Sequence, residues 1–188
     1  MRKRIFAAIC CALALCSCAS KTEYVPLEEI PDAYTLEDAE EDGCVIFNDG
    51  DISTGQDIWD EFLTDVDSGK KATARLVFYY TIGDPSRYAP EYYEAVKDEY
   101  PKMYVQDISY DGEKYTLRWF EENEIIRTYK YLMRYEGEPF SEWAMFERYV
   151  RYVLVNDDTV TWEDIEHGMF SAIFEDYIDH ATVYIDIQ

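Results

Sequence analysis

The cysteine at position 18 has the surroundings that define its chemistry most clearly. It ends the sequence Leu15-Cys16-Ser17-Cys18, which follows a basic start, Arg2-Lys3-Arg4, and an apolar run from Ile5 to Leu15. The run is too short to span a bilayer and is typical of a secretory leader. Because a cysteine follows a leucine and a small residue, we expect residues 1–17 to be a lipoprotein signal peptide and the Cys18 thiol to be acylated.

An imidazole and two carboxylates near the C-terminus could bind a cation. Glu163 and His167 are four residues apart in a predicted helix, so they share one face, and Glu166 is adjacent. The only other histidine of the chain is His180. A transition-metal site would therefore combine distant residues, and solvated surface positions explain this group more simply. We predict no metal site and no cofactor.

The abundant acidic residues allow two further chemistries. The loops at 48–51 and 156–158 are rich in oxygen ligands for Ca²⁺, but neither matches the twelve-residue calcium loop, and turn formation explains both. Glycoside hydrolysis needs two carboxyls at a defined separation, and 40 acidic residues provide such pairs by chance. The sequence contains no Gly-x-Ser-x-Gly elbow and no glycine-rich phosphate loop. We assign no catalytic residue, and whether the protein is an enzyme stays open.

Tyrosines are concentrated between residues 79 and 115. Aromatic side chains on loops stack on sugars or contact protein partners, whereas aromatic side chains in strands mostly serve packing. Tyr88, Tyr92 and Tyr93 lie in an acidic segment after a Gly-Asp-Pro turn, so we predict that these three form an exposed binding patch.

Composition limits the partners. The chain has 17 basic and 40 acidic residues and a net charge of −23, which excludes nucleic acid as an expected partner. Attachment to a membrane must then come from the lipid at Cys18, since a polybasic stripe is missing. The 18 tyrosines, nine phenylalanines and four tryptophans predict a folded core. Cys44 is the one cysteine left after lipidation, so we expect it to be a packed hydrophobic residue without a disulfide.

The periodicity predicts an acidic tether at residues 18–43, interrupted by two prolines, and a single globular domain at 44–188. We expect an α+β fold: a mostly antiparallel sheet with two main helices packed on one face. One helix covers 55–67 after an N-cap at Thr54, and the other follows a Thr161 cap and directs Ile165, Met169, Ile173 and Phe174 to the core. The strands are expected at 45–47, 73–82, 103–110, 114–121, 125–135, 146–155 and 181–187, with a short helix at 91–99.

Several motifs together resemble a known lipoprotein family. They are Asn48-Asp49-Gly50-Asp51, Tyr80-Thr81-Ile82-Gly83-Asp84-Pro85 and Asp107-Ile108-Ser109-Tyr110-Asp111-Gly112. This combination resembles the domain of unknown function 4362, found in small lipoproteins of Gram-positive bacteria. Residues 86–104 interrupt the family pattern as an insert. The resemblance implies one domain on a Gram-positive surface and assigns no catalytic residue.

These observations predict a lipid-anchored protein on the outer face of the cytoplasmic membrane. Its expected role is non-catalytic binding of a cell-wall or surface-protein ligand, and its oligomeric state is left open. The alternative is a cell-envelope glycan hydrolase that uses paired carboxylates.

Overall fold

The chain builds two β-sheets and four α-helices in the part that the structure, a computed structural model, describes: residues 24–138 and 146–187. The helices are α1 (Leu36–Glu41), α2 (Gln56–Asp67), α3 (Pro90–Val96) and α4 (Trp162–Phe170). The strands are β1 (Val45–Asn48), β2 (Asp51–Thr54), β3 (Ala72–Tyr80), β4 (Lys102–Tyr110), β5 (Tyr115–Phe120), β6 (Glu124–Tyr129), β7 (Tyr131–Gly137), β8 (Tyr149–Val155) and β9 (His180–Ile187). The predicted α+β class is confirmed.

The larger sheet, sheet A, has the strand order β2-β1-β3-β4-β5-β6. Strands β1 and β3 pair in parallel, with Val45 opposite Leu76, whereas β3 to β6 form an antiparallel meander. The parallel pair arises because α2 carries the chain back to the start of the sheet, as a crossover connection requires. Sheet A is therefore mixed, and the prediction of one mostly antiparallel sheet is wrong.

The smaller sheet, sheet B, contains β7, β8 and β9 in antiparallel order. The sequence pattern predicts one continuous strand over residues 125–135, but the structure divides it at Lys130. The residues before Lys130 pair with β5 and those after it pair with β8, and the Lys130 amide donates to the Val155 carbonyl at 3.1 Å. One hydrophobic run thus contributes to two sheets.

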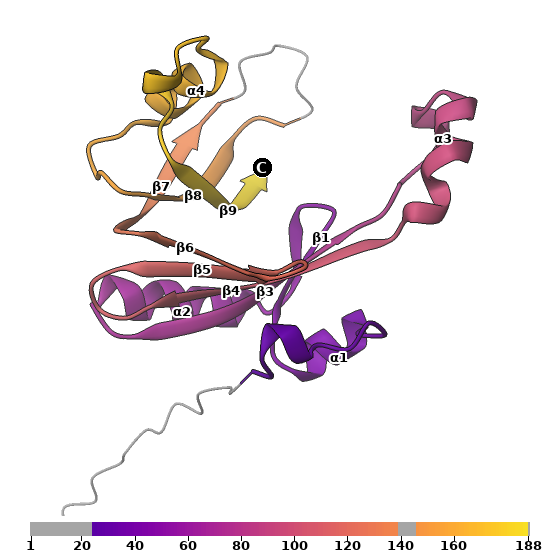
Figure 1. Cartoon of the computed structure of the whole chain (residues 1–188), viewed down its shortest axis with the longest axis horizontal. Helices are drawn as coiled ribbons and strands as arrows, with labels where there is room; N and C mark the ends of the chain where they lie inside the picture. Colours follow the sequence, from indigo (N-terminus) through magenta and orange to yellow (C-terminus); the bar gives the residue numbers. More distant parts are fainter. Residues whose placement is uncertain (1–23, 139–145, 188) are drawn as a thin grey trace, which may run out of the picture.

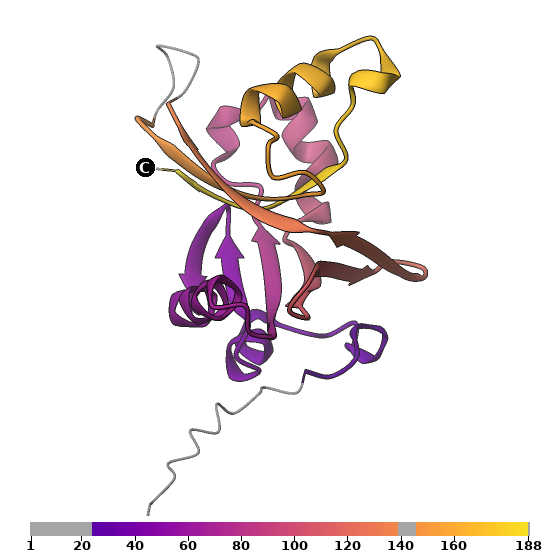
Figure 2. The ribbon, with the colours of Figure 1, turned by 90° about the vertical axis from the view of Figure 1, so that its left-hand side faces the viewer.

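The elements are arranged in layers (Figures 1 and 2). One face of sheet A packs against α2 and sheet B, and the shared core includes Trp59 and Phe62 of α2 with Leu154 and Tyr184 of sheet B. Helix α4 packs on the other side of sheet B, where Ile165 contacts Val153 and Val155. The two main helices thus pack on different sheets, so their predicted packing on one face of a single sheet is not confirmed.

Residues 24–43 cover the opposite face of sheet A. A short 3-10 helix (Leu27–Glu29) precedes α1, whose Thr35 and Asp38 form a capping box, and Ala39 of α1 is fully buried with Cys44 and Ile46. The predicted tether is therefore wrong for residues 24–43, because their apolar side chains pack against the sheet. Residues 18–23 of that tether lie outside the described residues.

The N-terminus of α2 also differs from the prediction. Its cap is Gly55 at φ 81°, since Thr54 is still part of β2. A Cβ atom at Gly55 would lie 2.5 Å from the Cys44 carbonyl oxygen, so only glycine fits at this close approach. The capping box of α4, with Thr161 and Asp164, is confirmed.

Strands β3 and β4 extend beyond the end of β5 and carry residues 81–101 as a projecting arm. Their pairing reaches Tyr80 opposite Lys102, whereas pairing of β4 with β5 stops at Gln106. The arm contains α3 between two short 3-10 helices, and Figure 1 shows it at the far end of this extension, away from both sheets.

Candidate functional site

The three predicted patch tyrosines lie together at the start of α3. The stacked rings of Tyr88 and Tyr92 have centroids 5.8 Å apart, and the Tyr88 and Tyr93 centroids are 6.3 Å apart. Ala89 is the N-cap and Pro90 the first helical residue, so Tyr88 and Tyr93 occupy the positions of a hydrophobic staple. We call Tyr88, Tyr92 and Tyr93 the arm tyrosine cluster.

The cluster is open to solvent. Tyr88 is 36% exposed and Tyr92 is 56% exposed, while Tyr93 is half-buried. The staple therefore accounts for the position of Tyr88 and Tyr93, but it leaves a large part of Tyr92 without a protein neighbour. Two near-parallel phenol rings present apolar faces together with hydroxyl groups, which suits stacking on a sugar ring or contact with a protein.

Charges around the arm leave it acidic. Lys97 is paired with Glu94 at 2.6 Å, and this hydrogen bond raises the pKa of the lysine. Lys102, at the base of the arm, is paired with Glu99 at 3.1 Å and lies 5.0 Å from the centre of the Tyr100 ring. Residues 81–101 carry five acidic side chains against two basic ones, Arg87 and Lys97, so the field at the cluster favours neutral or cationic ligands.

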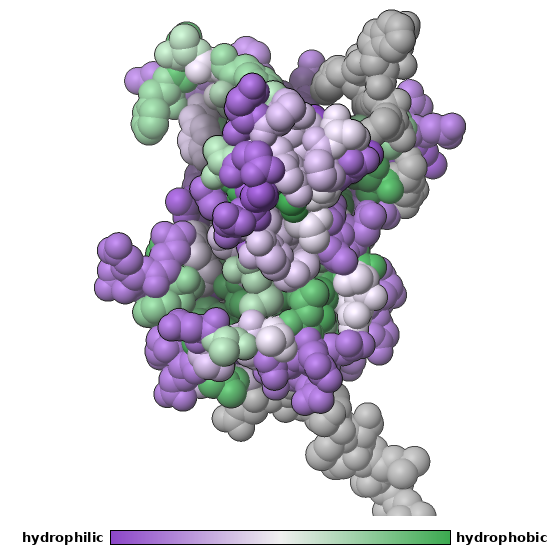
Figure 3. Space-filling view, turned by 90° about the vertical axis from the view of Figure 1, so that its right-hand side faces the viewer, coloured by the Kyte–Doolittle hydropathy of each residue, from purple (hydrophilic) through white to green (hydrophobic). Residues whose placement is uncertain are grey.

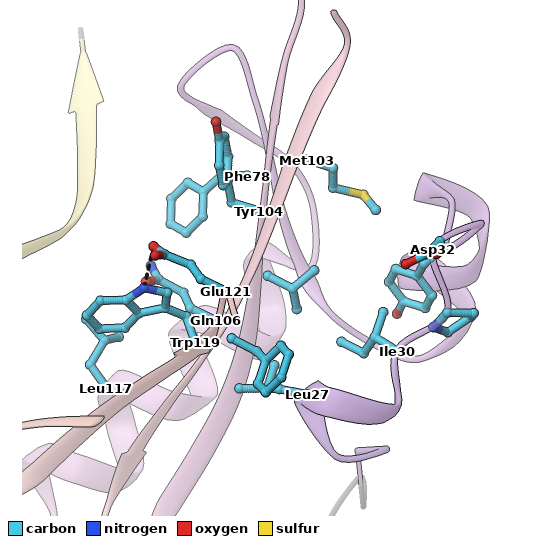
Figure 4. A pocket seen from close by; sticks show the side chains of 14 residues that line it. Leu27, Ile30, Asp32, Phe78, Met103, Tyr104, Gln106, Leu117, Trp119 and Glu121 are labelled. Atoms are coloured by element: carbon cyan, nitrogen blue, oxygen red, sulfur yellow. Dashed lines mark hydrogen bonds between the residues drawn. The ribbon is translucent and has the colours of Figure 1, made fainter. Parts of the chain in front are cut away.

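An apolar groove of about 650 Å³ lies at the base of the arm, beside β4. Figure 4 shows its lining on both sides of the strand: Phe78, Tyr104 and Trp119 on one side, and Met103 and Ile30 on the other. Figure 3, which faces the side of the molecule where α3 projects, shows a green, apolar hollow between purple, hydrophilic regions. No sequence pattern predicts this groove, because Phe78, Trp119 and Ile30 are far apart along the chain.

The cation candidates do not assemble into a metal site. Glu163, Glu166 and His167 line a shallow depression on α4, and Glu166 lies 4.0 Å from the Arg151 guanidinium. The His180 ring is 2.8 Å from the Ile178 carbonyl. Among residues 24–138 and 146–187, no group of three histidine, cysteine or acidic residues could hold a metal ion.

The two oxygen-rich loops are turns whose aspartates already accept hydrogen bonds from other residues of the chain. Asp49 has a positive φ of 51°, and its carboxylate accepts from the amide and hydroxyl of Thr81, both at 2.7 Å. Asp157 accepts from the amide and hydroxyl of Thr159 at 2.9 and 2.7 Å. Hydrogen bonding to Thr159 lowers the pKa of Asp157, the opposite of the shift that a general acid in a glycosidase needs.

A second apolar surface that differs from the sequence prediction lies at the end of α4. The periodicity predicts that Met169, Ile173 and Phe174 point to the core, but all three are exposed, and Phe170 and Phe174 are exposed by 85% and 86%. For Ile173 and Phe174 the prediction is wrong because α4 ends at Phe170 and the chain then folds back, so closely that a Cβ atom at Gly168 would clash with the Asp176 carbonyl oxygen. Met169 lies within α4, on a part of the helix that is exposed. Only Ile165 of the predicted core set is buried.

Two buried polar features serve the fold. Cys44 is fully buried, as predicted, and burial raises the pKa of its thiol to about 11. Arg75 and Asp107 form a bidentate ion pair with distances of 2.7 and 3.0 Å, and Arg75 also donates to the Val25 carbonyl at 2.7 Å. This pair fixes the N-terminal segment to sheet A. No sequence motif indicated it, because its partners are brought together by the register of β3 and β4.

Comparisons with protein-family descriptions, curated proteins and solved structures find no match. The likeness to the domain of unknown function 4362 therefore stays a prediction. Within the described ranges, no helix has the length and apolar character needed to cross a membrane. The predicted lipidation residue Cys18 and the predicted signal peptide at 1–17 lie outside the described residues.

Proposed function

We propose that this protein is a lipid-anchored binding module of the cell surface, which holds a cell-wall or surface-protein ligand through the arm tyrosine cluster. The observation that carries the proposal is the exposure of Tyr88 and Tyr92 at the tip of a projecting arm. Solvent-exposed aromatic rings that are held by local packing give contact area at low entropic cost. The resemblance to Gram-positive lipoproteins and the sequence around Cys18 support attachment to the outer face of the cytoplasmic membrane.

The glycan hydrolase alternative has less support. A glycosidase needs one carboxyl with a raised pKa and a second at a defined separation. The carboxyls with shifted pKa values in the described ranges are all shifted downward by hydrogen bonds or ion pairs, namely Asp38, Asp84, Asp111, Glu136, Asp157 and Asp164. Such groups suit caps and turns.

The test is retention of the purified protein on isolated cell-wall glycan and on immobilised surface proteins. We expect the wild type to be retained and the triple variant Tyr88→Ala/Tyr92→Ala/Tyr93→Ala to be released, while circular dichroism shows both folded. Cleavage of peptidoglycan or a chromogenic glycoside, abolished by changing one glutamate, would support the hydrolase instead.

A further inference from the structure

Strand β4 has an open edge where it passes the end of β5. Pairing between β4 and β5 runs from Tyr110 to Gln106, and β5 ends at Phe120, where the chain turns back into β6. Residues 102–105 pair with β3 on one side only. In the described part of the chain, no other strand covers the second side of this four-residue segment. An uncovered edge of this kind is a template for pairing with another strand.

The direction of the backbone groups along this edge follows from two hydrogen bonds. The Asp111 amide donates to the Lys114 carbonyl at 3.2 Å. Because the N–H and C=O groups of successive residues point to opposite sides of a strand, those of the odd-numbered residues of β4 point toward β5. On β3, the Asp49 amide donates to the Tyr79 carbonyl, which places the even-numbered groups of β3 toward β4. Both hydrogen bonds therefore indicate that the N–H and C=O of Met103 point away from β3, toward the open side of β4.

The groove surrounds this edge on both faces of sheet A. A strand added beside β4 would direct alternate side chains to opposite faces. On one face of the sheet they would contact Phe78, Tyr104 and Trp119 (Figure 4). On the other face they would contact Met103 and Ile30. An extended peptide is the ligand that uses both walls and the open backbone at the same time.

Charge selects the kind of peptide. The exposed carboxylates of Asp32 and Glu121 line the groove, and the whole chain carries a net charge of −23. A second copy of the chain would bring the same charge to the edge and be repelled, whereas lysine or arginine residues would be attracted.

We propose that the β4 edge and its groove bind an extended segment of a partner protein by strand addition, and that this segment has about four apolar residues flanked by basic ones. Main-chain hydrogen bonds to Met103 give affinity, and the two walls of the groove select side chains. The site is separate from the arm tyrosine cluster, so either proposal can fail without the other.

The test begins with a phage-displayed library of random nine-residue peptides selected on the purified full-length protein. We expect enriched peptides with an apolar centre and basic flanks. The best one is synthesised in two forms, N-methylated at one or the other set of alternate amides. One form should bind about tenfold or more weakly because it loses hydrogen bonds, and the other should bind like the parent. The parent should slow hydrogen exchange of the Met103 amide.

Matched charge variants locate the site. Asp32→Lys/Glu121→Lys should weaken binding of the basic peptide about tenfold, while Glu61→Lys/Glu175→Lys, with the same change of charge at exposed positions elsewhere, should leave it within about threefold. The triple tyrosine variant of the arm should bind the peptide normally. Absence of enriched peptides, equal affinity of both methylated forms, or dimerisation of the protein through this edge would each overturn the proposal.

Discussion

Arg75 and Asp107 form a charged pair inside the molecule, with side-chain exposures of 1% and 12%. Burial alone would lower the pKa of Arg75, but hydrogen bonds and attraction from Asp107 outweigh it and raise the pKa. The arginine also stacks over the Tyr24 ring, 4.7 Å from its centre. Breaking a buried pair leaves one charge without compensation, so each partner depends on the other.

We therefore expect Asp107→Asn to reduce the free energy of unfolding by about 3 kcal/mol or more in urea denaturation. Limited proteolysis should become faster in residues 24–43, because Arg75 holds this segment through the Val25 carbonyl. The control is Glu124→Gln, which removes the exposed pair with Arg118 (3.7 Å) and should cost less than about 1 kcal/mol. Equal effects of the two substitutions would contradict this role.

The capping boxes of α1 and α4 predict an acid dependence of stability. Hydrogen bonds from Thr35 and Thr161 lower the pKa values of Asp38 and Asp164 below the ordinary value of about 3.9. Because the folded pKa values are depressed, these carboxylates stabilise the fold above about pH 4, and the contribution is lost as the pH falls through the folded values. In Asp164→Asn, melting temperature should depend less on pH between about 2 and 4 than in the wild type; an unchanged profile would refute the assignment.

At the scale of elements, the β4–β5 hairpin depends on Gly112. The φ angle of Gly112 is 102°. The Asp111 carboxylate closes the turn by accepting hydrogen bonds from the amides of Glu113 and Lys114 at 2.9 and 3.0 Å. The sequence predicts a type I′ turn at Asp111-Gly112, but such a turn needs positive φ at both central residues, and Asp111 lacks it.

Gly112→Val should therefore lower the free energy of unfolding by about 1 kcal/mol or more, because a β-branched residue is strained at this φ. Glu113→Val, in the same loop but without a positive φ, is the matched control and should have a smaller effect. Thermal melts of the two variants provide the measurement, and equal melting temperatures would show that the glycine is dispensable.

Local signals predicted elements well and their arrangement poorly. The capping pair at Thr161, the helix at 56–67 and the strands at 72–80 and 102–110 follow from periodicity and caps, which act within a few residues. The break at Lys130 was not predictable, because residues on both sides have the same strand pattern and only their pairing partners differ. The parallel pairing of β1 with β3 likewise depends on contacts across the chain.

The candidate sites show the same difference between features set by neighbouring residues, which the sequence predicts, and features set by distant ones, which it does not. The arm tyrosine cluster was found because its residues are close in sequence and lie in an acidic insert. The groove combines Ile30, Phe78, Met103 and Trp119, and no spacing rule connects them. The end of α4 was misjudged because Phe174 continues the helical period beyond the residue at which the helix ends.

At the scale of the whole molecule, the proposed function requires attachment to the membrane through a lipid at Cys18. Cys18→Ser should leave the protein without acyl chains and outside the membrane fraction, since the proposed anchor is attached through that thiol. Palmitate labelling and fractionation of cells measure this. A variant that still labels and stays with the membrane would show that the anchor is elsewhere.

The most direct test of the proposed function compares two pairs of exposed tyrosines. Tyr88→Ala/Tyr92→Ala removes the open part of the arm tyrosine cluster, and Tyr131→Ala/Tyr177→Ala removes two tyrosines of similar exposure elsewhere. Affinity for the cell-wall or surface-protein fraction that retains the wild type is measured for both, with melting temperatures as a check on folding. We expect the arm variant to lose affinity about thirtyfold, as is typical of a binding hot spot, and the control to keep near wild-type affinity. Equal affinities of the two folded variants would contradict the proposal that the arm holds the ligand.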